Sequence, residues 1–223
     1  MKRIDSHNNF FFFTAALVFL LVFSSFVNSY WQHENRILLH VIMFLPQLAA
    51  YFSLNLSKRW RRFVALILVL HLAANGLYEV RQSHAISLAC LVIILVFFCG
   101  MVYTASKQVL RTGGIELNTI AGTIAIYLLL GLIWTVLYLI ALEAWPQGLS
   151  GLSYQQWDEN FGAAAYFSYV TMTTLGYGDI TPAVPVIRTL AYLQAITGSF
   201  YMAIVVASMV GAFNSRSPKN PKA

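Results

Sequence analysis

The sequence predicts an all-α membrane protein, and two observations lead to that class. Apolar residues make up 59% of the 223 positions and charged residues only 10%, which excludes an ordinary soluble domain and a disordered chain. Apolar segments also recur at the length of about 20 residues that a helix needs to cross a bilayer core. The expected spanning segments are 10–30, 36–54, 63–80, 85–105, 117–142 and 186–212.

The first segment has two interpretations. It follows a basic start and contains an apolar run from Phe10 to Val27, a pattern that also fits a cleaved signal peptide. The run is long for the apolar region of a signal peptide, so a retained membrane helix is favoured. Cleavage would leave the topology of the following segments unchanged.

The second and third segments contain the polar side chains His40, Gln47, His71 and Asn75. Ionisable groups inside a membrane suggest a functional site, and two histidines on neighbouring helices can bind a metal or haem or sense pH. No second pair of histidines at ligand spacing accompanies them, which favours hydrogen bonds between helices. Asn75, four residues after His71, fits such a polar seam.

The fourth segment carries both cysteines of the chain, Cys90 and Cys99. At about 100° per residue they lie on opposite faces of a helix, so they cannot form a disulfide with each other. Both are expected to be small buried side chains.

The basic residues indicate how the chain is oriented. With the N-terminus inside, eleven of the 14 Lys and Arg fall on inner segments, and only Arg36, Arg81 and Arg188 fall on outer ones. Six of the eight acidic residues fall on outer segments. This asymmetry predicts that both termini are cytoplasmic. The net charge of +6 is therefore explained by membrane topology and by contact of the inner segments with anionic lipid headgroups. This explanation argues against a nucleic-acid site.

A break in the helical pattern at Gly113 and Gly114 is the best domain boundary in the chain. It separates a four-helix transmembrane domain, residues 1–111, from a helix–loop–helix domain, residues 115–213. A short polar cytoplasmic tail is expected over residues 214–223.

An apolar stretch at 161–172 precedes the last spanning segment. It is too short to cross the membrane and suits a re-entrant helix, whose start Asp158 or Asn160 can cap. The negative dipole end of this helix favours a cation nearby. The irregular stretch TMTTLGYGDITP overlaps its end, at residues 171–182.

Irregular backbone at membrane depth is tolerated only where protein buries it or water lines it. Gly176 and Gly178 can adopt left-handed φ without a Cβ penalty, and alternating such residues directs successive carbonyl oxygens to one side. With the Thr174 hydroxyl, these oxygens form a ladder that can replace the hydration shell of a cation. One chain supplies one oxygen per level, so enclosing an ion predicts a homotetramer.

The segment YFSYVTMTTLGYGDITP, residues 166–182, resembles the pore signature of potassium channels. The family pattern is a Thr-Thr pair, an aliphatic residue, Gly-Tyr-Gly and Asp, and the surrounding helices match over 115–213. The resemblance implies a selectivity filter that binds K⁺. Its ion-binding residues are Thr174, Leu175, Gly176, Tyr177 and Gly178, with K⁺ held at the first four.

The resemblance also implies roles around the filter. Filter support and the outer mouth fall to Thr173, Phe167, Asp179 and Arg188. Gly198, twenty residues after Gly178, stands where the family has a gating hinge. Tight helix packing explains a glycine there equally well.

Some positions depart from the common family pattern. Leu175 replaces the commoner Val, which leaves the details of selectivity open. Val170 stands where some members have a carboxylate, so Asp179 is expected to lack that partner. Tyr166 and Phe167 occupy aromatic positions that often brace the filter, and Phe167 cannot donate a hydrogen bond.

Four helices before a pore resemble the layout of voltage-gated channels. A voltage sensor needs charges that move in the membrane field. Segment 84–106 contains no Lys or Arg, so the first four helices are predicted not to confer steep voltage dependence.

The sequence therefore predicts a passive K⁺-selective channel of the cell membrane and not an enzyme. It has no Gly-rich phosphate loop with Lys, which disfavours an ATP-driven pump. No cofactor is expected besides the permeant K⁺, and no soluble partner besides further copies of the chain. The alternatives are a less selective cation channel and, in a different class, a membrane redox or haem protein built on the first four helices.

Overall fold

The computed structural model describes residues 9–30, 36–54, 57–81, 83–111 and 116–216. Almost all of them are helical, which confirms the all-α class. The helices are α1 (Asn9–Tyr30), α2 (Arg36–Ser53), α3 (Lys58–Arg81), α4 (His84–Arg111), α5 (Leu117–Ala144), α6 (Trp157–Met172) and α7 (Pro185–Arg216). Two short strands, β1 (Leu149–Ser150) and β2 (Thr181–Pro182), pair antiparallel.

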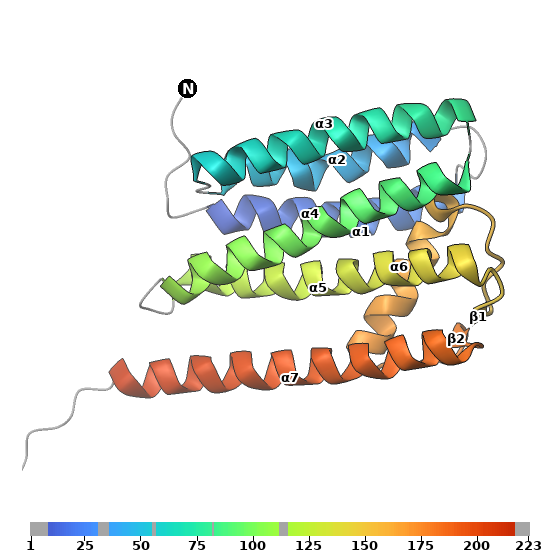
Figure 1. The fold of residues 1–223 in the computed structure, drawn as a ribbon. Coiled ribbons are helices and arrows are strands. Elements are labelled where there is room, and N and C mark those ends of the chain that lie inside the picture. Colours follow the sequence, from blue (N-terminus) through green and yellow to red (C-terminus); the bar gives the residue numbers. More distant parts are fainter. Residues whose placement is uncertain (1–8, 31–35, 55–56, 82, 112–115, 217–223) are drawn as a thin grey trace, which may run out of the picture.

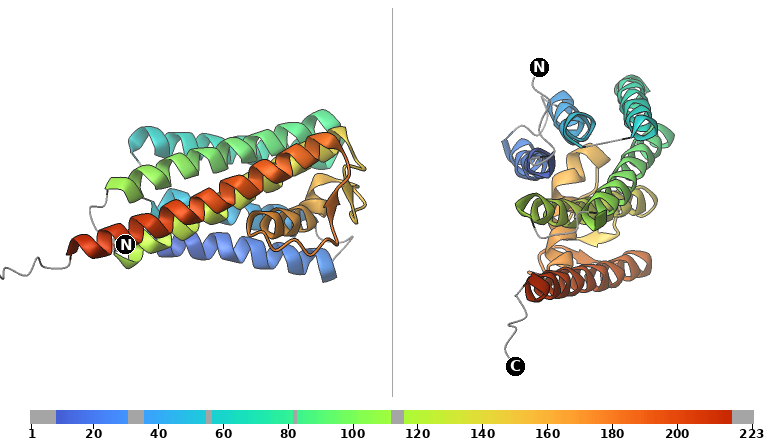
Figure 2. Two further views of the ribbon diagram at one scale, coloured as in Figure 1. Left: turned by 90° about the horizontal axis from the view of Figure 1, so that it is seen from below. Right: turned by 90° about the vertical axis from the view of Figure 1, so that its left-hand side faces the viewer.

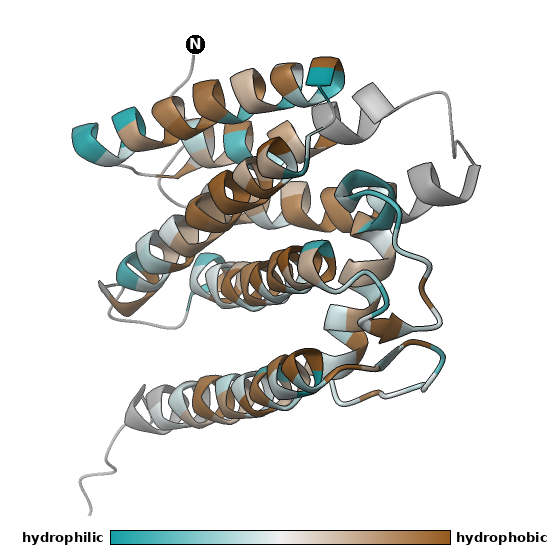
Figure 3. Ribbon diagram, turned by 45° about the vertical axis from the view of Figure 1, so that its right-hand side comes forward, coloured by the Kyte–Doolittle hydropathy of each residue, from teal (hydrophilic) through white to brown (hydrophobic). Residues whose placement is uncertain are grey.

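Within the described residues, α3, α4, α5 and α7 are long and apolar enough to cross a membrane. Figure 3 shows hydrophobic turns along these helices and hydrophilic turns at both ends of α3. Shorter apolar stretches lie in α1, at Phe10–Ser24, and in α2, at Ile42–Phe52. A multi-pass membrane protein is therefore confirmed, and membrane crossing by α1 and α2 stays a prediction.

Helix α5 occupies the centre of the fold, because it packs against α1, α4, α6 and α7. The short helix α6 crosses from the α1–α4 side of the molecule toward α7, which lies at the opposite edge (Figures 1 and 2). β1 lies in the loop between α5 and α6, and β2 lies in the loop between α6 and α7. Their pairing joins these two loops.

The first four helices form a row in which α1 packs on α2, α2 on α3 and α3 on α4. Both ends of this row, α1 and α4, also pack on α5. The predicted grouping of residues 1–111 as a domain of its own stays a prediction, and residues 112–115, where its boundary was placed, lie outside the described part of the chain.

Helix α1 contributes directly to the core. Phe13, Leu17 and Leu20 follow helical spacing and are at most 1% exposed. The Thr14 hydroxyl donates to the Ala121 carbonyl of α5 at 3.0 Å. This packing makes α1 part of the core of the described fold, and its retention in the mature protein stays a prediction.

Two details differ from the sequence prediction. Helix α7 continues to Arg216, so the first residues of the predicted tail are helical, and 217–223 lie outside the described residues. Cys90 is buried as expected, but Cys99 is exposed. It lies on the opposite face of α4, where the described chain does not cover it.

Candidate functional site

The irregular segment 173–179 lies between the end of α6 and β2, and all seven of its residues are exposed in the single chain. Helix α6 holds its start, since α6 packs against both α5 and α7. Helix α6 begins at Trp157, four residues before the apolar stretch that predicted it. The helix is therefore longer than the sequence suggested.

The backbone of the segment alternates in handedness. Thr174, Gly176 and Gly178 have φ of 58°, 59° and 82°, whereas Leu175 and Tyr177 between them are not among the positive-φ residues. Alternation of this kind directs successive carbonyl oxygens toward one side, which neither a helix nor a strand does. The two glycines were expected in this conformation. Thr174 was not, because a residue with a branched Cβ adopts it rarely.

The amides of the segment point back to the helix that precedes it. The Val170 carbonyl accepts hydrogen bonds from the Leu175 amide at 2.9 Å and from the Gly176 amide at 3.4 Å. The Thr173 hydroxyl donates to the Tyr169 carbonyl at 2.7 Å. These bonds satisfy the last carbonyls of α6 and fix how the segment leaves the helix.

The far end of the segment is held by the β1–β2 ribbon. Gly151, just after β1, has φ of 84°, and a Cβ at this position would lie 2.1 Å from the Asp179 carbonyl oxygen. Only glycine lets the loop approach Asp179 this closely. The loop before α6 is thereby fixed to the residues that follow the irregular segment.

Asp179 has a partner that sequence reasoning did not assign. The Tyr166 hydroxyl on α6 donates to Asp179 Oδ2 at 2.7 Å. This bond holds the pKa of the Asp179 carboxyl below its ordinary value, because it stabilises the ionised form. As expected from Val170, no carboxylate on α6 pairs with Asp179. The Tyr166 hydroxyl, one helical turn before Val170, is its partner instead.

Arg188, at the start of α7, is exposed and holds the turn before its own helix. Its Nε donates to the Pro182 carbonyl at 3.2 Å, and one terminal nitrogen donates to the Ala183 carbonyl at 3.1 Å. Its role in the structure is therefore to fix the path from β2 into α7.

A buried polar network that the sequence did not reveal joins α5, α6 and α7. The Gln194 amide on α7 donates to the Ser168 hydroxyl at 2.7 Å and to the Ser168 carbonyl at 2.9 Å. Tyr138 on α5 donates to Gln194 Oε1 at 2.6 Å, and Ser168 donates to the Gly131 carbonyl at 2.7 Å. Since α5 and α7 lie far apart in sequence, periodicity alone could not pair these residues.

Aromatic packing completes the support behind α6. The Phe167 ring lies edge-on to the Tyr138 ring, with centroids 4.9 Å apart. The Tyr169 hydroxyl donates to the Leu128 carbonyl at 2.6 Å. A Cβ on Gly131 would lie 2.3 Å from the Tyr169 ring, so this glycine makes room for the tyrosine.

Gly198 lies where α7 crosses the end of α6. A Cβ at this position would lie 2.4 Å from the Met172 carbonyl oxygen, which is closer than any real contact. Tight packing therefore accounts for this glycine. The gating hinge expected at Gly198 stays a proposal.

The start of α6 is arranged differently from the expectation. The N-cap residue is Gln156, without a capping bond from its side chain, and Asp158 lies inside the first turn. Asn160 Oδ1 accepts a bond from the Gln155 amide at 2.9 Å, and its amide donates to the Ser153 carbonyl at 3.1 Å. Asn160 thus fixes the loop before the helix, and neither predicted residue is the cap.

Of the polar residues of the first helices, Gln47 and His71 contact each other, whereas the predicted seam does not reach Asn75, whose buried amide has no hydrogen-bond partner among the described residues. The Gln47 amide nitrogen lies 2.6 Å from His71 Nδ1, and the Phe44 ring packs on the imidazole with centroids 4.6 Å apart. Asn75 is buried one turn away. These contacts confirm a hydrogen bond between helices at His71. The side chain of His40 lies outside the described residues.

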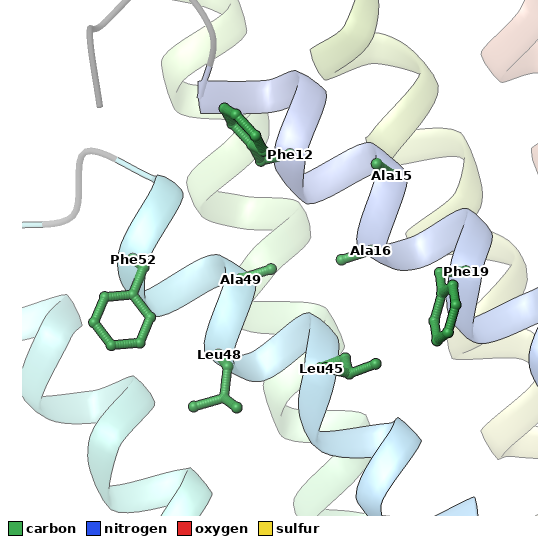
Figure 4. A pocket seen from close by; sticks show the side chains of 8 residues that line it. All are labelled: Phe12, Ala15, Ala16, Phe19, Leu45, Leu48, Ala49 and Phe52. Carbon is green, nitrogen blue, oxygen red and sulfur yellow. The ribbon is translucent and has the colours of Figure 1, made fainter. Parts of the chain in front are cut away.

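The described residues contain no group of three or more His, Cys, Asp or Glu that could hold a metal ion. A groove between α1 and α2 is lined only by apolar side chains (Figure 4). Its lining residues are Phe12, Ala15, Ala16, Phe19, Leu45, Leu48, Ala49 and Phe52. It offers no group for chemistry, so the irregular segment remains the candidate site.

Comparison with known protein families supports the same site. The family model described as ion channel matches residues 122–215, which contain α6, the segment 173–179 and most of α5 and α7. No curated protein and no solved structure matched the chain. Residues 122–215 are therefore similar to the ion channel family.

Proposed function

We propose that the protein is a passive, K⁺-selective channel whose filter is the segment 173–179. The alternating φ at Thr174, Gly176 and Gly178 carries this proposal. The amides of Leu175 and Gly176 both donate to the Val170 carbonyl, so they point back toward α6. In the proposed filter, the carbonyl oxygens of the segment face the ion path. Carbonyl oxygens in this arrangement replace the water around a K⁺ ion.

The proposal includes a homotetramer around the filter. Leu175 and Tyr177 are 54% and 67% exposed in one chain, and only 11% of the apolar stretch of α7 is buried. Exposed apolar side chains at membrane depth pack against another chain or lipid, and unpaired carbonyl oxygens there need an ion or water. Four copies around one axis supply both the packing partner and the ion path. The proposed K⁺ ligands are the carbonyls of residues 174–178 and the Thr174 hydroxyl.

The charge distribution supports cytoplasmic termini in the cell membrane. In the structure the only Lys and Arg of α4, Lys107 and Arg111, lie in its last two turns, so the long apolar part of the helix carries no gating charge. The proposed channel therefore lacks steep voltage dependence.

Reversal potentials under opposed K⁺ and Na⁺ gradients test this function in liposomes that contain the purified full-length chain. We expect a reversal near the K⁺ equilibrium potential. A reversal near zero with clear current would instead establish a less selective cation channel, and Leu175→Val would show whether that residue is the cause. An absorbance band near 400 nm from bound haem, without any current, would favour the redox alternative.

A further inference from the structure

The Glu143 side chain, in the last turn of α5, is only 8% exposed and is surrounded by polar groups. His84 Nδ1 lies 2.5 Å from Oε2. The Tyr154 hydroxyl donates to Oε1 at 2.6 Å, and the Ser87 hydroxyl donates to the same oxygen. A nearly buried carboxylate needs such partners, and here each of its oxygens has at least one.

The partners of Glu143 come from two different parts of the chain. His84 and Ser87 lie in the first turn of α4, whereas Tyr154 lies in the loop between β1 and α6. Burial and then the bond to Glu143 raise the pKa of Tyr154, so its hydroxyl keeps the proton that it donates. Glu143 thus connects α4 to the loop that leads directly into α6.

A second contact holds the start of α6 from the same direction. The Tyr78 hydroxyl on α3 donates to Gln156 Oε1 at 3.2 Å, and its ring lies 6.1 Å from the ring of Trp157. Trp157 is fully buried. The C-terminal end of α3 and the N-terminal end of α4 therefore both lie close to the point where α6 begins (Figure 1).

The position of the N-terminal end of α6 affects the candidate filter, because a rigid helix transmits a shift at one end to the other. A helix of 16 residues is about 24 Å long, so a tilt of about 3° at its start moves its far end by about 1 Å. The far end is Met172, and segment 173–179 follows it without a linker. Contacts at Tyr154 and Gln156 thereby set the position of the segment.

We propose that Glu143 is a positioning residue through which α4 places α6 and the segment 173–179, and that His84 makes this placement sensitive to pH. The inference rests on the ion-channel family of the pore domain and does not need K⁺ selectivity. A protonated imidazole beside a carboxylate forms a stronger, charge-assisted contact than a neutral one, and histidines change charge between about pH 5 and 8. Lower pH therefore tightens the connection.

Other charged and titratable groups lie on the elements around this contact. Tyr154 and Ser87 face Glu143 directly. Tyr78 and Asp158 lie near enough to Tyr154 to act on it electrostatically. Glu79 and Arg81 are exposed at the end of α3, one turn before His84 in the sequence. Of all these groups, only His84 has an imidazole side chain.

Hydrogen exchange of the full-length protein in lipid nanodiscs tests the connection without any need for current. We expect Tyr154→Phe to lower protection in residues 151–160 by about tenfold or more, the size expected for a lost bond to a carboxylate. Glu143→Gln should lower it as well. The matched control is Glu116→Gln, an exposed glutamate at the other end of α5. Protection in both variants equal to that of the control overturns the proposal.

The pH dependence is tested in the same samples. After correction for intrinsic exchange rates, wild-type protection of residues 151–160 should be higher at pH 6 than at pH 8. His84→Gln should abolish this difference, and its persistence in that variant overturns the role of His84. If Glu143→Gln does not assemble, Ser87→Ala removes one partner and leaves the charge in place, and it should give an intermediate loss of protection.

Ion flux from liposomes gives a readout that a purely structural role would not change. With pH varied on one side only, wild-type flux should change between pH 6 and 8 and His84→Gln flux should not. Glu143→Asp, which keeps the charge, should retain part of the pH profile that Glu143→Gln loses. Absence of flux from every variant would count against the channel function, whereas the exchange data would still decide the role of Glu143.

Discussion

Gln194 on α7 and Ser168 on α6 share two hydrogen bonds, of 2.7 and 2.9 Å, in a site where both residues are fully buried. Because Tyr138 on α5 donates to the same Gln194 side chain, one amide joins the three helices of the pore domain. The network lies where α6 packs against α5 and α7. It holds the helix that carries the candidate filter.

The first prediction concerns this network. Gln194→Leu leaves the buried Tyr138 hydroxyl without its partner, and an unsatisfied buried group of this kind costs about 1–3 kcal/mol. We expect a lower melting temperature in detergent. Thr189→Ala is the control, because Thr189 is exposed and donates only to the Pro185 carbonyl within its own helix. Equal melting temperatures for the two variants would contradict the role of the network.

The second prediction separates packing from hinge motion at Gly198. Gly198→Ala places a methyl group 2.4 Å from the Met172 carbonyl, and overpacking of this kind costs about 1–3 kcal/mol. We expect loss of thermal stability. Gly211→Ala, further along α7, is the control, since its added Cβ meets no atom within 4 Å in the chain. Unchanged stability with an altered open probability would instead support the hinge.

The third prediction concerns the left-handed residues. Gly178 has φ of 82°, where a side chain with a Cβ costs about 1–2 kcal/mol, and a tetramer would repeat this cost four times. We expect Gly178→Ala to abolish K⁺ flux in liposomes. Gly76→Ala in α3 should leave flux intact, because that position has space and an ordinary φ. Normal flux from Gly178→Ala would place the ion path elsewhere.

The fourth prediction concerns Asp179 and its bond to Tyr166. The bond lowers the pKa of Asp179 below 3.8, so its contribution to stability is present above that pH and is lost as the pH falls through the lowered value. We expect Tyr166→Phe to move the pKa of Asp179 up toward 3.8, because the ionised form loses a donor. A carboxyl-carbon NMR titration measures it.

The control for that titration is Tyr192→Phe, which changes an exposed tyrosine on α7. It should leave the titration of Asp179 as it is in the wild type. An identical pKa in Tyr166→Phe and wild type would show that the bond at 2.7 Å is not formed in solution.

Local sequence alone determined the helices, the short α6 and the special backbone of Gly176 and Gly178. Each depends on properties that a short stretch of chain contains, namely apolar length for the helices and the missing Cβ for the glycines. The predicted segments 117–142 and 161–172 accordingly match α5 and the end of α6 within a few residues. The motif at 173–179 likewise predicted a channel, and the ion channel family model matches residues 122–215, which contain it.

Only the tertiary structure decided which distant residues meet. Gln194 pairs with Ser168, Tyr166 with Asp179, and Glu143 with His84 and Tyr154. The sequence did not indicate any of these pairs, including the one between Tyr166 and Asp179 at the motif, because each partner lies at least eleven positions away. Hydrophobic period places a residue on a face of its helix, but the partner of a polar group depends on how whole helices cross, and that is set by packing across the entire fold.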